Sequence, residues 1–344
     1  MRLGLGLNLS LGSSGGAADK DMVLVYAITS PSTNIQLAIQ ANATWFDTGQ
    51  SVSINWGDGS AAETVSATSP QTGYVGHTYT SAGTYTIIIS GNMKMYGRSS
   101  GVDIAGQTLL THIHSFGKLG ITSFSRAFRG RMRLTSVPKT LPSNVTNTYC
   151  MFQDCNGAAF NPDVSNWDVS KVTNMFFMFN YCNGAAFNPD VSNWNVSKVE
   201  NMAYMFGNCY GAAFNPNVTN WDVSNVTAMN SMFGGCSNAN FKGGRGVDGL
   251  GIGIANWKPK SLSTGATTGL SNFMLSARVQ DATYLDSILN AWAALIGDPV
   301  NPLPANITAT FPANQPYNGS VSGAALTALA AHGWAISTLI DTGN

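Results

Sequence analysis

Apolar and polar positions recur with a period of 27 residues through the middle of the chain. The segments Asn156–Pro162 and Asn183–Pro189 have identical sequences, and the segment 210–216 repeats them with small changes. The apolar residues keep this period in four columns: Cys155, Cys182, Cys209 and Cys236; Trp167, Trp194 and Trp221; Met151, Met178, Met205 and Met232; Phe152, Phe179, Phe206 and Phe233. A fixed period in this range predicts a solenoid, in which each unit buries its apolar face only against its neighbours.

Within one repeat the pattern changes from period two to a helical spacing. Trp167 and Val169 alternate with polar residues, which favours a short strand with one face inward. The next apolar positions are spaced by 3, 3, 1 and 3 residues, which favours one face of a short helix: Val172, Met175, Met178, Phe179 and Cys182. We therefore expect an α/β, leucine-rich-repeat-like solenoid over 98–275, with its best copies at 155–236, whose strands form a parallel sheet.

Residues 20–97 carry a different pattern of short alternating stretches separated by turn residues. The stretches lie at 22–26, 35–39, 52–56 and 85–89, and they predict an all-β sandwich. After Trp56, the segment Gly57–Ser60 predicts a tight turn, because glycine adopts positive φ and the Asp58 carboxylate can accept a bond from nearby backbone.

The first residues alternate strictly between leucine and small or polar residues, which predicts a strand with one leucine face. We expect residues 1–19 to be an arm whose strand docks on a partner chain or a neighbouring subunit. The alternative is a strand that packs on its own domain. The docking residues are Leu3, Leu5, Leu7, Leu9 and Leu11.

Residues 276–344 are expected to cap the solenoid, because its last unit would otherwise expose an apolar face. An amphipathic helix is predicted over 284–295, a strand over 307–311, and a small-residue helix over 324–330 that ends at Gly333. Before the cap, Trp257 follows Trp221 nine residues later than the period requires. The glycine-rich insertion Gly243–Gly253 accounts for the delay and predicts a projecting contact loop.

Composition narrows the function classes. Charged residues make up 10% of the chain, against roughly 25% in typical soluble domains. Lys+Arg and Asp+Glu both number 17, so there is no basic field for nucleic acid. No apolar run reaches the roughly 20 residues that span a bilayer, so no membrane insertion is expected.

We find no catalytic constellation, phosphate loop or metal knuckle, and we expect no enzyme activity, no cofactor and no metal. Asp58 with His77 could form an acid–base pair or bind a metal, but turn and strand roles are the favoured interpretation. His112 and His114 share one strand face and could bind a metal on a trimer axis, or simply pack in the sheet. The column Asp168, Asn195 and Asp222 could be a calcium ladder, although stacking of alternating charge explains it.

Disulfides along the cysteine column are geometrically awkward, and buried thiols fit better, so the cysteines define no redox compartment. Exposed aromatic residues at repeat positions are the candidate binding residues, because aromatic rings can stack on sugars. They are Phe177, Tyr181, Tyr204 and Tyr210.

Two family resemblances follow from these motifs. The segments Ile54–Ser60 and His77–Tyr85 resemble the PKD domain, an immunoglobulin-like sandwich of extracellular proteins. The text from Phe160 to Met175, followed by Met178-Phe179 and Cys182, resembles the BspA-like (DUF285-type) leucine-rich-like repeats of bacterial and phage surface proteins. This combination implies ligand binding or host-surface attachment without identifying the ligand.

Two hypotheses remain. The first is a bacteriophage virion structural protein (tail fibre, adhesin or capsid decoration) that forms homo-oligomers, contacts other virion proteins and binds a host-surface glycan or protein. The second is a secreted bacterial cell-surface adhesin, and an enzyme such as a glycan depolymerase is a distant third. An adhesin is expected to carry a secretion signal and a C-terminal anchor. The N-terminus mimics a secretion signal, but the alternation of leucine with glycine works against the helix that a signal forms, and Asp341–Asn344 is not an anchor, so we favour the virion surface.

Overall fold

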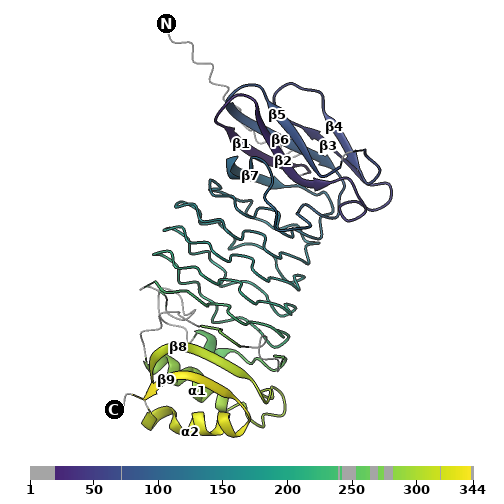
Figure 1. Cartoon of the computed structure of the whole chain (residues 1–344). Coiled ribbons are helices and arrows are strands. Elements are labelled where there is room, and N and C mark those ends of the chain that lie inside the picture. Colours follow the sequence, from purple (N-terminus) through teal and green to yellow (C-terminus); the bar gives the residue numbers. More distant parts are fainter. Residues whose placement is uncertain are drawn as a thin grey trace.

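The computed structural model describes residues 20–70, 72–238, 241, 253–263, 270–274, 282–317 and 319–341. These residues form three consecutive parts, with strands at the N-terminal end, a series of stacked coils in the middle and a cap at the other end (Figure 1). Within the described ranges the sheets are open, and the two α-helices both lie in the cap. The leucines of the predicted docking strand lie outside the described residues, as does nearly all of the insertion 243–253.

The N-terminal part is all β. Its strands are β1 (Met22–Ile28), β2 (Thr33–Gln40), β3 (Ser51–Asn55), β4 (Glu63–Ser66), β5 (Tyr74–Tyr79), β6 (Gly83–Gly91) and β7 (Leu110–Phe116). Five of them form an antiparallel sheet in the order β4-β3-β6-β1-β7, and β2 pairs with β5. The alternating residues of both sheets are buried in a common core, as period-two patterning requires. The four predicted strand stretches fall in β1, β2, β3 and β6 and are confirmed.

Strand β7 joins the N-terminal sheet to the coils. It follows the 3-10 turn η1 (Gln107–Leu109) and pairs antiparallel with β1. On its other side the Ile113 N–H donates to the Ser136 carbonyl at 3.1 Å. The sheet therefore extends beyond residue 97, and one strand is shared between the sheet and the first coil.

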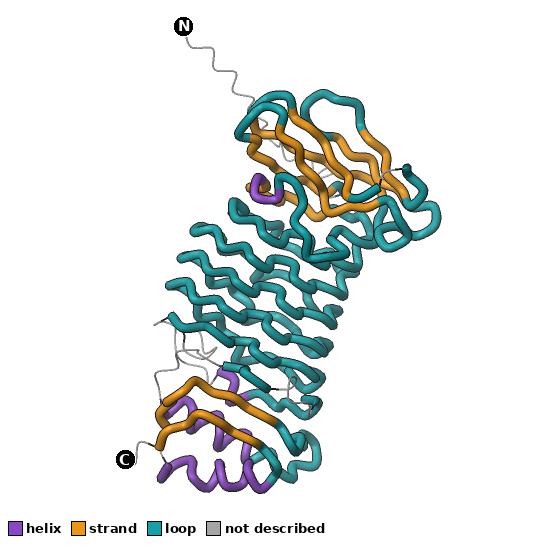
Figure 2. The backbone as a smooth tube through the Cα atoms, viewed as in Figure 1, coloured by secondary structure: helices purple, strands orange, loops and turns teal. Residues whose placement is uncertain are grey.

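The coils, which we call the repeat stack (residues 122–238), are joined edge to edge. Single parallel bridges link residues in equivalent places of successive coils: Ser123, Asn147, Asn174, Asn201 and Ala228. Between two such coils the N–H groups of Met175, Phe177 and Phe179 donate to Asn201, Ala203 and Met205 at 2.9–3.1 Å. Figure 2 shows these coils as turns and loops lying parallel to one another.

The short helix predicted for each repeat is wrong, and so is the strand expected at Trp167 and Val169, because the described part of the repeat stack contains only turns and isolated bridges. Every second N–H of this segment bonds to the next coil, so it cannot donate to the carbonyl four residues back as a helix requires. Phe177 and Tyr181 also have φ of 58° and 59°, which a right-handed helix excludes. An apolar spacing of 3 and 4 fits this tightly turned coil as well as it fits a helix.

Identical side chains stack on one another inside the coils. Four tryptophans form one such stack, in which the centroids of successive rings lie 6.5, 6.3 and 6.3 Å apart and the planes of successive rings differ by at most 4°: Trp167, Trp194, Trp221 and Trp257. The Trp194 indole N–H donates to the Val164 carbonyl of the preceding coil at 2.9 Å, and later tryptophans repeat this bond. Trp257 keeps its place despite the longer interval, so the insertion leaves the stacking intact.

The cysteines of the repeat stack are free and buried, which confirms the interpretation as interior thiols. The Sγ of Cys182 lies 3.2 Å from the Phe152 carbonyl oxygen of the preceding coil, and Cys209 and Cys236 make the equivalent contact. Burial raises the pKa of the Cys155 thiol to about 12, so this group stays protonated at neutral pH.

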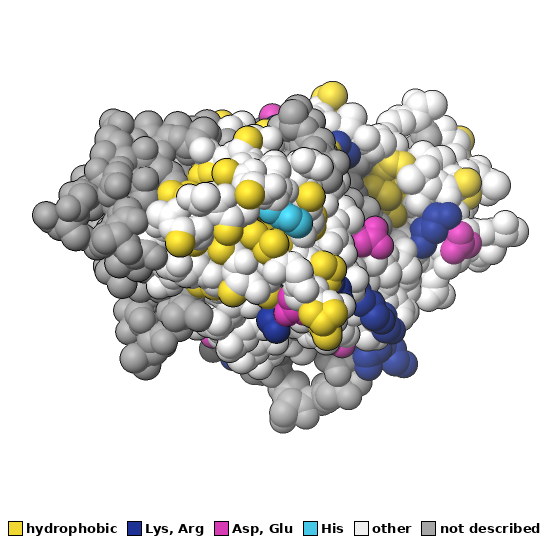
Figure 3. Space-filling view, turned by 90° about the horizontal axis from the view of Figure 1, so that it is seen from below, with side chains coloured by type: hydrophobic (Ala, Val, Ile, Leu, Met, Phe, Trp, Pro, Cys, Tyr) yellow, Lys and Arg dark blue, Asp and Glu magenta, His cyan; other side chains and the backbone are white. Residues whose placement is uncertain are grey.

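The cap consists of η2 (Gly253–Asn256), α1 (Ala282–Ala293), β8 (Thr308–Tyr317), α2 (Gly319–Ala331) and β9 (Ala335–Asp341). The predicted helices and strand coincide with α1, α2 and β8, and Gly333 ends α2 with φ of 85°. A parallel bridge between Leu270 and Ala309 continues the pattern of the coils into β8. Apolar side chains gather on the end face of the molecule in Figure 3, where α2 exposes Ala324, Ala328 and Ala331.

The tryptophan column should be a principal source of stability. Replacing Trp194, which is 3% exposed, by alanine removes three ring contacts and one hydrogen bond. We expect the free energy of unfolding to fall by about 3–5 kcal/mol, as for other buried Trp→Ala changes. Urea denaturation followed by circular dichroism measures this loss. The matched control is Asn193→Ala, an exposed neighbour, for which we expect a change of at most about 0.5 kcal/mol; equal losses would contradict the stacking argument.

Candidate functional site

Aromatic side chains form a ridge along one outer edge of the repeat stack. We define this aromatic ridge as Tyr149, Phe176, Phe177 and Tyr204. Tyr149 stacks on Phe176 with centroids 5.3 Å apart, and Phe177 stacks on Tyr204 at 4.6 Å. At the N-terminal end the Arg126 guanidinium lies 4.4 Å from the Tyr149 ring centroid. The ridge is half-buried and crosses three successive coils.

The backbone that carries the ridge is left-handed at two places in each coil. The first place includes Arg126, Cys150, Phe177, Tyr204 and Ser231, all with φ between 52° and 58°. The second includes Asp154, Tyr181 and Asn208, with φ between 59° and 62°. Each non-glycine residue in this conformation costs about 1–2 kcal/mol. Because the conformation recurs in every coil, it belongs to the coil itself and not to one site.

Sequence reasoning missed these left-handed positions, although the second column carried a signal. Its members are Gly130, Asp154, Tyr181, Asn208 and Gly235. Glycine, asparagine and aspartate are the residues that tolerate positive φ best. A column with these residues around one tyrosine therefore predicts a left-handed turn.

The structure separates the four predicted binding residues into two kinds. Phe177 and Tyr204 come together in the aromatic ridge, where they contact each other. Tyr181 and Tyr210 are 44% and 51% exposed, and no ring contact involves them among the described residues. The second pair is therefore more accessible to a ligand than the first.

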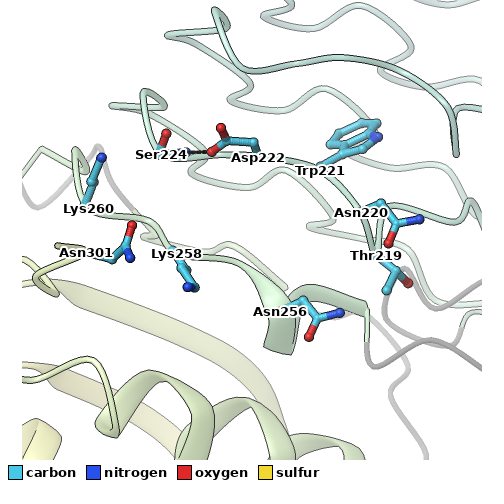
Figure 4. A pocket seen from close by; sticks show the side chains of 9 residues that line it. All are labelled: Thr219, Asn220, Trp221, Asp222, Ser224, Asn256, Lys258, Lys260 and Asn301. Carbon is cyan, nitrogen blue, oxygen red and sulfur yellow. Dashed lines mark hydrogen bonds between the residues drawn. The ribbon is translucent and has the colours of Figure 1, made fainter. Parts of the chain in front are cut away.

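A polar hollow of about 440 Å³ lies between the last coils and the cap (Figure 4). Its side chains come from three segments: Thr219, Asn220, Asp222 and Ser224; Asn256, Lys258 and Lys260; and Asn301. Because Trp257 points inward, its neighbours Asn256 and Lys258 face outward. Neither lysine makes an ion pair with any described residue, and both are exposed.

A larger, mostly apolar hollow of about 1110 Å³ lies between the N-terminal sheet and residues 138–144. Val23 and Ile88 from the outer face of the sheet line it opposite Leu141. Asp21 stands at its edge, next to Lys20, where the described chain begins. We call this space the apolar hollow.

Asp58 and His77 hold a turn together. The His77 Nε2 lies 2.7 Å from Asp58 Oδ2, and the imidazole stacks on Trp56 at 4.8 Å. The other Asp58 oxygen accepts bonds from the N–H and hydroxyl of Ser60 at 3.0 and 2.6 Å. The Ser60 hydroxyl, ahead of His77, lowers the pKa of Asp58 to about 2. This arrangement agrees with the favoured interpretation as a turn.

The other candidate polar groups also serve the local backbone. Asp168, Asn195 and Asp222 each accept the N–H of the serine two residues on, at 3.0–3.2 Å, so this column caps turns. His112 and His114 stack at 5.9 Å, and burial, followed by the charge of His112, lowers the pKa of His114. No three His, Cys, Asp or Glu side chains converge within the part of the chain that the structure describes.

Residues 122–244 match the family model described as "Mycoplasma protein of unknown function, DUF285". The range covers the repeat stack and supports the BspA-like part of the resemblance; it is compatible with a surface or extracellular protein of that type. No curated protein and no solved structure matches the chain. The PKD-like resemblance of the N-terminal strands stays a prediction.

No described helix has both the length and the apolar character that a membrane crossing requires.

The turn at Asp58 should make the folded protein less stable as the pH falls into the acid range. The folded-state pKa of about 2 lies below the usual value of about 3.9, so the ionised carboxylate stabilises the fold above pH 4. This contribution is lost as the pH falls through about 2. Thermal unfolding between pH 5 and pH 2 should show the Tm of the wild type converging on that of Asp58→Asn. The Ser60→Ala variant should lose part of the same pH dependence, and parallel curves for all three proteins would contradict this role.

Proposed function

We propose that this chain is a non-enzymatic structural protein of a bacteriophage virion, a tail-fibre, adhesin or capsid-decoration subunit. Its N-terminal segment docks on the particle or on a neighbouring subunit. Residues 98–275 act as a binding solenoid that is displayed at the virion surface and attaches to a host-surface glycan or protein. The observation that carries this proposal is the division of the repeat stack into an invariant interior and an outer face of periodic aromatic and amide side chains.

The interior supports a display role because it leaves the outer face free to vary. Stacked rings, methionines and thiols fill the coils from Met151 to Cys236 in the same way. On the outer face, the residue after each tryptophan varies between aspartate and asparagine, as at Asp168, Asn195 and Asp222. The exposed tyrosines also occupy different positions in different coils. A rigid support with variable surface residues is the arrangement that repeat proteins use for binding.

The state of the thiols also favours binding over catalysis. A catalytic cysteine needs a lowered pKa and access to substrate. Burial instead raises the pKa of Cys150 to about 11 and that of Cys155 to about 12. The charged pair that sequence reasoning singled out, Asp58 with His77, is engaged in a turn.

The alternative is a secreted bacterial cell-surface adhesin of the BspA-like type. The family match favours this alternative, since it extends over the repeat stack and carries no virion association of its own. The two functions share the binding surface and differ in what the N-terminal segment contacts. An experiment on each feature therefore separates them.

Binding should depend on the accessible tyrosines. Binding of the full-length protein is measured on an array of immobilised bacterial and animal polysaccharides. The double variant Tyr181→Ser/Tyr210→Ser should bind about 10-fold more weakly than the wild type, because each lost stacking contact is worth roughly 0.5–1.5 kcal/mol. The matched control is Val102→Ser, a 68% exposed apolar residue outside the repeat stack, which should bind normally. Unchanged binding by the tyrosine variant would remove these residues from the site.

Particle docking should depend on the leucine segment. Deleting residues 2–12 should abolish incorporation into particles, measured by quantitative mass spectrometry of purified virions. The deleted chain should keep the circular dichroism spectrum and Tm of the full chain. Incorporation at normal copy number would reject the docking strand.

Light scattering identifies where the segment binds. If the full chain assembles and a chain lacking residues 1–16 is monomeric, the segment is an assembly element. If both are monomeric, the segment packs on its own chain, and the apolar hollow beside Asp21 is the nearest described surface for it.

A further inference from the structure

A buried guanidinium without a partner lies where the N-terminal sheet meets the first coil. Arg131 is 0% exposed, and its Nε, Nη1 and Nη2 atoms have no hydrogen-bond partner among the described residues. An arginine side chain carries five N–H donors and remains protonated. A buried charge of this kind destabilises a protein by several kcal/mol unless it is paired and hydrogen-bonded. The site therefore requires an acceptor that the described side chains do not supply.

The surroundings of Arg131 are short of negative charge. Arg98 is also 0% exposed, but its guanidinium donates to the carbonyls of Arg126, Val102 and Arg129 at 3.0–3.1 Å. Burial, followed by the positive charge of Arg131, lowers the pKa of Arg98 to about 10, so the two cations lie within electrostatic reach. The carboxylate near them, Asp103, is 3.8 Å from Arg98 and 68% exposed.

A hydroxyl group without a partner belongs to the same buried region. Tyr26, from the centre of β1, is 0% exposed, and its hydroxyl makes no hydrogen bond with the described residues. Burial raises the pKa of Tyr26, and the positive charge of Arg131 acts in the opposite direction. Arg131 and Tyr26 thus both carry buried polar atoms that no described residue satisfies, and only the guanidinium is a cation.

We propose that a small monovalent anion of the chloride class binds at the buried Arg131 guanidinium. Water would supply lone pairs but would leave the buried Arg131 cation without a counter-charge. The unpartnered atoms are closed to solvent, which favours a small ion over a phosphate or a carboxylate-bearing molecule. This inference does not depend on the proposed function.

Thermal unfolding tests the anion. The full-length protein is heated at constant ionic strength while sodium chloride replaces sodium gluconate. A ligand that binds only the folded state raises the Tm with its concentration, and we expect a rise of about 2–4 °C. Arg131→Met should show no chloride dependence, whereas Arg133→Met, an exposed arginine two residues on, should keep the rise. A wild-type Tm that is independent of chloride would overturn the proposal.

A second measurement keeps the test decisive if Arg131→Met does not fold. Crystals of the wild-type protein grown in sodium bromide should give an anomalous difference peak within hydrogen-bond distance of the Arg131 guanidinium. Ordered water without an anomalous signal at this position would overturn the proposal, as would a bromide peak only at exposed lysines.

Discussion

The repeat stack depends on one constraint, that every coil must satisfy the backbone of the next. Alternate N–H groups in the segment from Met175 to Tyr181 point out of their own coil and bond to carbonyls in the following one. A buried, unpaired amide is unfavourable by an amount comparable to a lost hydrogen bond, so a coil cannot be stable alone. The neighbouring coil must present its carbonyls in the same register, and this requirement fixes the bonded segment of each coil, while the rest of a coil can change in length, as it does before Trp257.

The same register explains the columns of identical side chains. When coils superimpose, equivalent positions meet, and flat or slender side chains fill the repeated space in one way only. Phe179 stacks on Phe206 at 5.7 Å with planes 4° apart, and Trp194 stacks on Trp221 at 6.3 Å with planes 1° apart. The indole N–H and the thiol of each coil find an acceptor in the preceding coil, so the few polar atoms of the interior also repeat. Function is left to the outer positions, where no neighbour imposes an identity.

The period, the inward residues and the cap could be predicted from the sequence, because each follows from the spacing of apolar residues. The internal form of a coil could not. Apolar spacings of 3 and 4 residues are expected for a helix, and also for a chain that alternates hydrogen bonds to the next coil with tight turns. The left-handed backbone at Phe177 distinguishes the two, but it is visible only in the structure. The sharing of β7 between sheet and stack was also hidden, since pairing partners far apart in sequence leave no local pattern. Among the candidate site residues, the exposure of Tyr181 and the contact of Phe177 with Tyr204 required the fold, because equivalent columns do not reveal which ring covers another.

The two ends of the stack are where this regularity must stop, and they carry its polar exceptions. An interior coil meets a copy of itself, but an end coil meets a surface of different shape, so the columns of identical residues cannot continue. At the cap the column of Asp168, Asn195 and Asp222 changes to Lys258, and the polar hollow opens beside it. At the N-terminal sheet the stacked apolar side chains give way to the buried guanidiniums of Arg98 and Arg131. The two ends of the stack therefore carry side chains that the repeats do not contain. The polar hollow lies where the coils meet the cap, and the buried arginines lie where the coils meet the N-terminal sheet.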